Sequence, residues 1–444
     1  MPSPRDLAPP RAVTRDRRPL AAALIANTAS VWGSSLTLIG IPWFVLEATG
    51  SATRAGVVAF CAMVPVVVAS LAGGPLIDRI GRRRISVGTD LLCGAAVGAV
   101  PLLHRAGLLE FWTLCALMAA HGLFHAPGET ARSALLPELA ERAGTTVTRA
   151  ASLFDGVSRG ARMLGAAVGG VLIAALGAET VLAWDAATFA VSAAVVAAGL
   201  RGLPAGEPVR RTTPRPSYRR ELAEGYAYLV RTPLLLAISG LVLCTNALDQ
   251  GGSAVLLPVH AERELGGPAA LGLVSALWGV GAVVGALLYG AFGARFRRWP
   301  VFVACALLIG LPRYATAAFS SELAPLAVVM VCGGLAGGMI NPILSTVTFE
   351  RVPAELRTRV LGVSRAGSML ATPLGGLTAG LLVDGVGLTA AFLVVGGVYF
   401  VVTLTPLLFP VWRQMDGGRP AQDPVRGQLN GLPFVSRTDR KPAC

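Results

Sequence analysis

The residues best suited to chemistry stand inside long apolar stretches of the sequence. Asp249 lies between Asn246 and Gln250 within the apolar run 233–258. A charge at membrane depth costs about 2.5–3.5 kcal/mol on insertion scales, so such a residue marks a proton or substrate pathway by default. Asp249 is therefore our first candidate for a group that takes up and releases a proton. The alternative is a structural hydrogen-bonding residue near a helix break before Pro258.

Two further groups are proton-coupling candidates. His121 and His125 are four residues apart and share one helical face, and histidine titrates near neutrality. Asp90 lies two turns into the apolar run 84–104. For His121 the alternative is a neutral, packed histidine, and for Asp90 it is a structural ion pair with a nearby arginine, which we favour.

Other polar and aromatic residues have less specific roles. Asp155 can pair with Arg159 at i, i+4. We interpret Asp155, Arg159 and Arg162 together as a structural charge network. Aromatic and amide side chains in apolar runs could line a cavity; these candidates are Asn27, Trp32, Asn246, Gln250, Trp278 and Asn341.

Composition predicts the elements that hold these residues. The 444 residues are 54% hydrophobic and only 14% charged, which is typical of a polytopic membrane protein. Apolar runs of about 20 residues favour helices, because a helix satisfies its own backbone in the bilayer. We predict an all-α membrane protein with twelve transmembrane helices, at 20–46, 53–77, 84–104, 110–136, 150–176, 179–200, 233–258, 269–293, 299–318, 322–349, 359–383 and 388–411.

The arginines predict the orientation. The formal net charge is +13, but the arginines gather in alternate loops and at the ends, which is typical of positive-inside topology and argues against nucleic-acid binding. Arg313 is among the few assigned to outer loops. Both termini are then cytoplasmic: a tail over 1–19, a six-helix bundle over 20–200, a linker over 201–232, a second bundle over 233–411 and a disordered tail over 412–444. Within the linker, Glu221 to Arg231 is amphipathic and is predicted to lie along the membrane surface.

The two halves repeat. Gly290 to Arg298 follows the eighth span as Gly74 to Arg82 follows the second, at an offset of 290 − 74 = 216 residues. Pro353 after the tenth span corresponds to Pro137 after the fourth, at 353 − 137 = 216. Two separate landmarks at one offset indicate a duplicated six-helix unit, and transporters built from such repeats place their site between the halves.

The turn after the second span carries the most specific motif. It reads Gly-Pro-Leu-Ile-Asp-Arg-Ile-Gly-Arg-Arg from residue 74, and Gly81 can take the positive φ of a tight turn. This resembles the signature loop of the major facilitator superfamily, which implies the twelve-helix fold of two bundles. The resemblance implies a gate formed by Gly74, Asp78, Arg79, Gly81, Arg82 and Arg83, in which Asp78 meets the start of the eleventh helix near Leu361.

Further segments resemble one branch of that superfamily, the macrolide-efflux-like and enterobactin-exporter-like proteins. They include Ile41 to Ser51, Leu136 to Leu139, Asp185 to Phe189 and Glu350 to Arg359. The chain departs from common antiporter patterns, because Gly165 to Gly170 lacks a proline and the fourth span lacks a central arginine. At these positions the chain lacks residues that common drug antiporters use for proton coupling.

The resemblance implies export of a small hydrophobic or amphipathic compound, such as a drug or a self-made metabolite, by proton antiport across a bacterial inner membrane. Alternatives are a siderophore or lysolipid transporter, and a non-transporting sensor on the same fold. We expect a monomer whose partners are a small-molecule substrate, protons and the bilayer. No phosphate-binding G-x-x-x-x-G-K-[ST] loop, metal-ligand spacing or nucleophile–base pair occurs, so we expect no ATP use, no cofactor and no enzyme activity.

Overall fold

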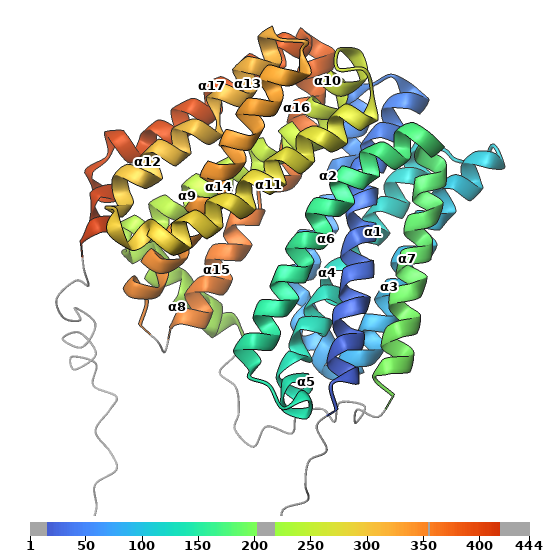
Figure 1. The fold of residues 1–444 in the computed structure, drawn as a ribbon, viewed down its shortest axis with the longest axis horizontal. Coiled ribbons are helices and arrows are strands. Elements are labelled where there is room, and N and C mark those ends of the chain that lie inside the picture. The colour runs from blue at the N-terminus through green and yellow to red at the C-terminus, as the bar shows by residue number, and fades with distance from the viewer. Residues whose placement is uncertain (1–15, 202–217, 354–355, 418–444) are drawn as a thin grey trace, which may run out of the picture.

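The computed structural model describes residues 16–201, 218–353 and 356–417. Within these ranges the side chains of 71–79, 218–222, 294 and 358 are not described. The described residues form helices and turns, and no strand occurs among them. The helices of the first half pack together, as do those of the second half (Figure 1). This agrees with the predicted all-α membrane fold.

The described residues of the first half form seven helices. They are α1 (Arg18–Thr49), α2 (Ala52–Ile80), α3 (Arg82–Arg105), α4 (Phe111–Ala134), the short α5 (Leu136–Ala143), α6 (Val147–Leu176) and α7 (Ala178–Gly199). Gly50 ends α1 at a φ of 64°, and Gly81 separates α2 from α3 at a φ of 96°. The positive φ predicted for Gly81 is therefore confirmed.

The described part of the second half begins with α8 (Tyr218–Arg231), and three of its spans are built from more than one helix. The remaining elements are α9 (Pro233–Gly251), the π-helical η1 (Gly252–Leu256), α10 (Leu257–Arg263), α11 (Pro268–Phe292), η2 (Gly293–Arg295), α12 (Arg298–Ile309), α13 (Leu311–Phe319), α14 (Leu323–Arg351), α15 (Arg357–Met369), α16 (Thr372–Val386), α17 (Leu388–Leu408) and η3 (Pro410–Asp416). A π-helical segment often marks a functional site, and η1 follows Asp249 within three residues.

Eleven helical segments among the described residues are long and apolar enough to cross a membrane. The twelfth predicted span is α4, whose 24 residues are long enough to cross but include His121, His125 and Pro127. These residues lower its hydropathy. Counting α4, the described residues contain one helical segment for each of the twelve predicted spans.

The two halves meet mainly along two helix pairs, α2 with α16 and α6 with α11. A Cβ on Gly170 would lie 2.6 Å from the Cα of Gly272, and one on Gly56 would lie 2.5 Å from the carbonyl oxygen of Gly376. These contacts lie toward the end of the molecule where Gly50 joins α1 to α2, which we call the Gly50 end. The opposite end, where α1 begins, is the Arg18 end. In Figure 1 the halves converge at the top, the Gly50 end, and lie farther apart at the bottom.

Two predictions about segments outside the spans need correction. Residues 412–416 are not a disordered tail, because η3 packs on the second half and Trp412 is buried against Phe302. Helix α8 does not lie only on a surface, because Leu229 is buried in a cluster with Val352 and Val360. The rest of the predicted tails and most of the linker lie outside the described residues.

Candidate functional site

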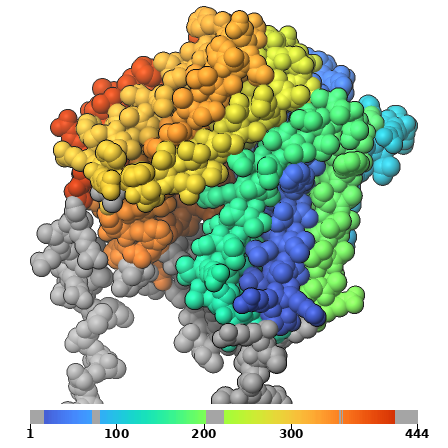
Figure 2. Space-filling model, in the orientation of Figure 1, coloured from blue at the N-terminus to red at the C-terminus, as the bar shows by residue number. Residues whose placement is uncertain are grey.

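Two adjoining cavities lie between the halves. The larger has a volume of about 440 Å³ and is lined chiefly by α9, α11 and α13. The smaller, of about 370 Å³, is lined chiefly by α1, α2 and α4. Leu38, Ala166 and Gln250 line both. On the outer face seen in the space-filling view, α6 of the first half lies against α11 of the second (Figure 2). A site that both halves build can change shape when the halves move.

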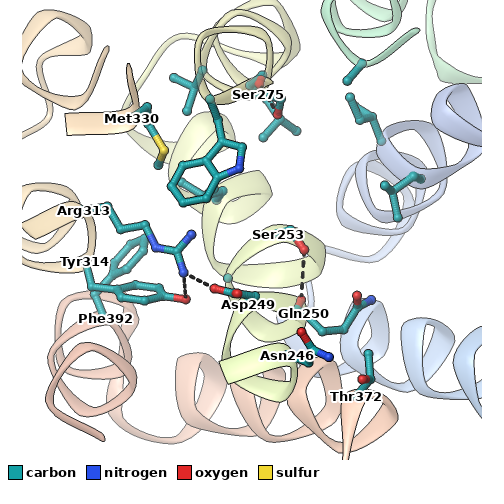
Figure 3. A pocket seen from close by; sticks show the side chains of 18 of the residues that line it. Asn246, Asp249, Gln250, Ser253, Ser275, Arg313, Tyr314, Met330, Thr372 and Phe392 are labelled. Carbon is teal, nitrogen blue, oxygen red and sulfur yellow. Dashed lines mark hydrogen bonds and ion pairs between the residues drawn. The ribbon is translucent and has the colours of Figure 1, made fainter. Parts of the chain in front are cut away.

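An ion pair stands on the wall of the larger cavity. Nη2 of Arg313 donates to Oδ1 of Asp249 and, at 3.1 Å, to the hydroxyl of Tyr314 (Figure 3). The Arg313 side chain is 11% exposed, whereas that of Asp249 is 41% exposed. The acid thus faces the cavity and the base is set behind it. The assignment of Arg313 to an outer loop is wrong, because α13 holds it inside the ninth span.

Aromatic rings enclose the Arg313 guanidinium. Its central carbon lies 4.9 Å from the ring centroid of Trp278, 4.6 Å from that of Tyr314 and 5.3 Å from that of Tyr399. Cation–π contacts of this kind stabilise a cation that has lost water. The buried Nε of Arg313 has no hydrogen-bond partner among the described residues. The base is therefore held mainly by the rings and by one carboxylate.

The cavity candidates divide into two groups. Asn246, Gln250 and Trp278 line the larger cavity, as predicted. Trp32 and Asn341 line neither cavity: Trp32 packs against the core, and Asn341 is exposed. The sixth candidate, Asn27, is fully buried in the first half, so its assignment to a cavity is wrong.

The two histidines line the smaller cavity. The rings of His121 and His125 are stacked with centroids 5.6 Å apart. Nδ1 of His125 is 3.2 Å from the hydroxyl of Ser34, whereas Nδ1 of His121 has no partner among the described residues. The predicted shared face is confirmed. The remaining lining of this cavity is mostly apolar, which suits a hydrophobic ligand better than a charged one.

Asp90 belongs to a buried network inside the first half. Nη1 of Arg132 donates to both carboxylate oxygens of Asp90 at 2.9 Å, and the two side chains are 1% and 4% exposed. Hydroxyls of Ser30 and Ser192 also donate to Asp90, and Arg132 donates to Asn27. Asp90 lines neither cavity. The favoured interpretation of Asp90, a structural ion pair with an arginine, matches this geometry.

The charge network predicted on the fifth span has other partners. Asp155 and Arg159 are exposed, and no ion pair joins them among the described residues. Arg162 instead lies 3.6 Å from Glu129 of α4. The predicted Asp155–Arg159 pair is therefore wrong: both residues are exposed, and Arg162 pairs with another helix.

The signature turn is described only in part. Gly74, Asp78 and Arg79 lie where side chains are not described, so the gate remains a prediction. Arg82 donates to the carbonyl of Ala134 at 2.8 Å, and Arg83 to that of Ala197 at 2.7 Å. These arginines tie the turn to α4 and α7 of the same half.

Sequence reasoning missed three buried groups. Arg313 was hidden by its place near a predicted span end, and Arg132 by the polar residues around it in α4. Asp185, to which no role was given, is fully buried and accepts hydrogen bonds from Thr37 and Thr188. The signal in each case was a charged residue inside a predicted span.

Comparisons with known proteins agree with this architecture. The profile of the Major Facilitator Superfamily matches residues 23–250 and 240–438. The multidrug efflux pump Tap of Mycobacterium tuberculosis is 33% identical over 408 residues, covering 90% of this chain and 96% of that protein. Macrolide efflux protein A of Streptococcus pyogenes is 23% identical over 403 residues, covering 88% and 95%.

Solved structures show the same fold at low identity. The nucleoside transporter NupG superposes with a TM-score of 0.70 at 15% identity, covering 88% of this chain and 98% of that one. A bacterial homologue of the human lysosomal transporter Spinster gives a TM-score of 0.61 at 15% identity, covering 89% and 98%. Fold and relatives together indicate a transporter. The chain is a multi-pass membrane protein that belongs to the major facilitator superfamily, in the branch with macrolide-efflux-like proteins.

Proposed function

We propose that this protein exports small hydrophobic or amphipathic compounds, drugs among them, in exchange for protons. The observation that carries the proposal is the pair of adjoining cavities between the halves, largely apolar but with the Asp249–Arg313 ion pair on one wall. Apolar walls with a few placed polar groups suit amphipathic ligands. The efflux functions named for Tap and for macrolide efflux protein A support the direction and the class of substrate.

Asp249 is the proposed proton carrier. Its carboxylate faces the cavity and is reached by protons or by a cationic substrate group, whereas Arg313 is held behind it by aromatic rings. Protonation of Asp249 removes the negative charge that balances Arg313. Leaving a charge unpaired in a low-dielectric site is costly, so protonation favours a rearrangement of α9 against α13. This links proton binding to a change in cavity shape.

The remaining proton candidates take other roles in this proposal. Asp90 is bound by Arg132 out of reach of both cavities, so it holds the first half together. His121 and His125 form part of the substrate surface, because their stacked rings face an apolar cavity.

The conformational state of the molecule follows from its proposed orientation in the membrane. With both termini placed in the bacterial cytoplasm by the arginine distribution, the Arg18 end is cytoplasmic and the Gly50 end is external. Because the halves contact each other toward the Gly50 end, the structure then corresponds to an inward-facing form of a monomeric transporter in the inner membrane. The signature turn with Asp78 would close the opposite end in the other state.

The test is accumulation of fluorescent drugs in efflux-deficient cells that express the protein. We expect lower accumulation than in cells without it, and loss of the difference when a protonophore collapses the proton gradient. Efflux that persists with the protonophore would contradict proton coupling. An unchanged accumulation of every compound, with the protein present in the membrane, would contradict drug export and favour a dedicated metabolite such as a siderophore or lysolipid.

A further inference from the structure

Asp384, at the last turn of α16, contacts the start of α2 in the other half. Its Oδ2 accepts a hydrogen bond from the Thr53 amide at 2.8 Å and from the Ser51 hydroxyl at 2.9 Å. Its Oδ1 accepts one from the Ala52 amide at 3.3 Å. One carboxylate of the second half thus binds three donors of the first half at the Gly50 end.

The donors are those that a helix cannot satisfy by itself. The first amides of an α-helix have no carbonyl partner within the helix, and the helix dipole places partial positive charge there. The Ser51 hydroxyl accepts from the amide of Arg54, at 3.3 Å, and leaves those of Ala52 and Thr53 unsatisfied. Asp384 supplies the acceptors for Ala52 and Thr53, so the N-cap of α2 is completed by the opposite half.

The same face of α16 makes the closest backbone contacts with α2. Gly376, Gly380 and Asp384 recur every four residues and therefore lie on one side of the helix. A Cβ on Gly380 would lie 2.6 Å from the carbonyl oxygen of Ala52, and the Thr53 hydroxyl donates to the carbonyl of Gly380 at 3.2 Å. Small residues let the helices approach, and this approach brings Asp384 within reach of the α2 amides.

We propose that the hydrogen bonds from Ser51, Ala52 and Thr53 to Asp384, the Asp384 cap, hold the Gly50 end closed. When the halves separate at this end, the α2 amides lose a charged acceptor and exchange it for water. The cap therefore favours the closed Gly50 end. The predicted gate at Asp78 would join α2 to α15 at the Arg18 end. One acidic residue would then bridge the two halves at each end of the molecule. The inference rests on alternating access and is independent of the substrate and of the coupling ion.

The experiment measures the opening of the Gly50 end in the purified full-length protein without substrate. Spin labels are placed at Glu110, before α4, and at Glu322, before α14, in a background without native cysteines; both positions are exposed and lie in different halves. Pulsed electron–electron double resonance then reports the distribution of distances between the two labels. We expect one short-distance population in the parent and a longer one in Asp384→Ala, with the ratio of open to closed molecules rising about tenfold.

Two further variants make the result specific to the cap. Ser51→Ala removes one donor and should give a smaller shift in the same direction, and Asp384→Asn should lie between the parent and Asp384→Ala. Glu47→Ala is the matched control, because Glu47 is exposed at the same end and has no hydrogen-bond or ion-pair partner among the described residues. Distributions of Asp384→Ala and Ser51→Ala that match the parent would overturn the proposal, as would an equal shift in Glu47→Ala.

Discussion

Arg313 and Asp249 form an ion pair across two spans, with the acid facing the larger cavity and the base enclosed by aromatic rings. The pair joins α13 to α9, and α9 continues into the π-helical turn η1. A change in the charge of Asp249 therefore acts on two spans at once. Because η1 already departs from regular helical hydrogen bonding, α9 has a place at which it can adjust.

The buried pair of Asp90 and Arg132 should matter more for stability than for transport chemistry. Removing one partner of a buried ion pair leaves an uncompensated charge and costs about 3–5 kcal/mol. We expect Arg132→Ala to lower the midpoint of thermal unfolding strongly in detergent. The matched control is Arg162→Ala, since its pair with Glu129 is largely exposed and worth about 0–1 kcal/mol. Equal effects of the two substitutions would contradict the structural role of Arg132.

Trp278 should contribute to ligand binding through the larger cavity. It lines the cavity, where a cationic group of a ligand over its ring would gain about 0.5–2 kcal/mol. We expect Trp278→Ala to weaken binding of a fluorescent drug by about 2- to 30-fold in a titration of purified protein. Trp278→Phe should retain part of the affinity. Trp184, exposed on α7, is the control, and Trp184→Ala should bind as the parent does.

Gly285 should be a point of close packing between α11 and α14. A Cβ there would lie 2.0 Å from the carbonyl oxygen of Leu335, which is backbone and cannot rotate away. We expect Gly285→Ala to cost about 1–3 kcal/mol, as overpacking usually does. Thermal unfolding checks this, with Gly397→Ala as the control, because no atom lies within 4 Å of the Cβ at that position. Stability that is equal in both variants would contradict the packing.

His121 should affect substrate recognition without carrying the proton. We expect His121→Asn to change the relative transport of different drugs while transport stays sensitive to a protonophore. The reason is that His121 lines the apolar cavity, whereas the Asp249–Arg313 pair lies in the other one. A His121→Asn protein whose drug export no longer depends on the proton gradient would move the coupling site to the histidines.

The spans and the family could be predicted from the sequence because both depend on local signals. Long apolar runs predict the helices, and the turn from Gly74 to Arg83 has a spacing that indicated the family, which the family profile confirms. The 216-residue offset likewise reflects the repeat without any knowledge of contacts. The π-helical turn and the breaks within three spans have no comparably clear signal.

Sequence reasoning found several residues of the site but not their partners in other helices. Asn246, Asp249 and Gln250 lie together on one helix, so their spacing was enough to place them in one polar patch. Arg313 is 64 residues away and Asp384 is more than 330 residues from its partners, so only the packed structure brings them together. Partners of buried charges depend on which helices are neighbours, and that information is absent from a single sequence.

The central claim is that Asp249 couples drug movement to protons. Its most direct test is drug transport by purified protein in liposomes, driven by an imposed pH gradient, for the parent, Asp249→Asn and the control Asp155→Asn. Asp155 is an exposed acid outside both cavities. We predict that the pH gradient drives transport by the parent and by Asp155→Asn, whereas Asp249→Asn binds drug without gradient-driven transport. Gradient-driven transport by Asp249→Asn at the rate of the parent would contradict the account.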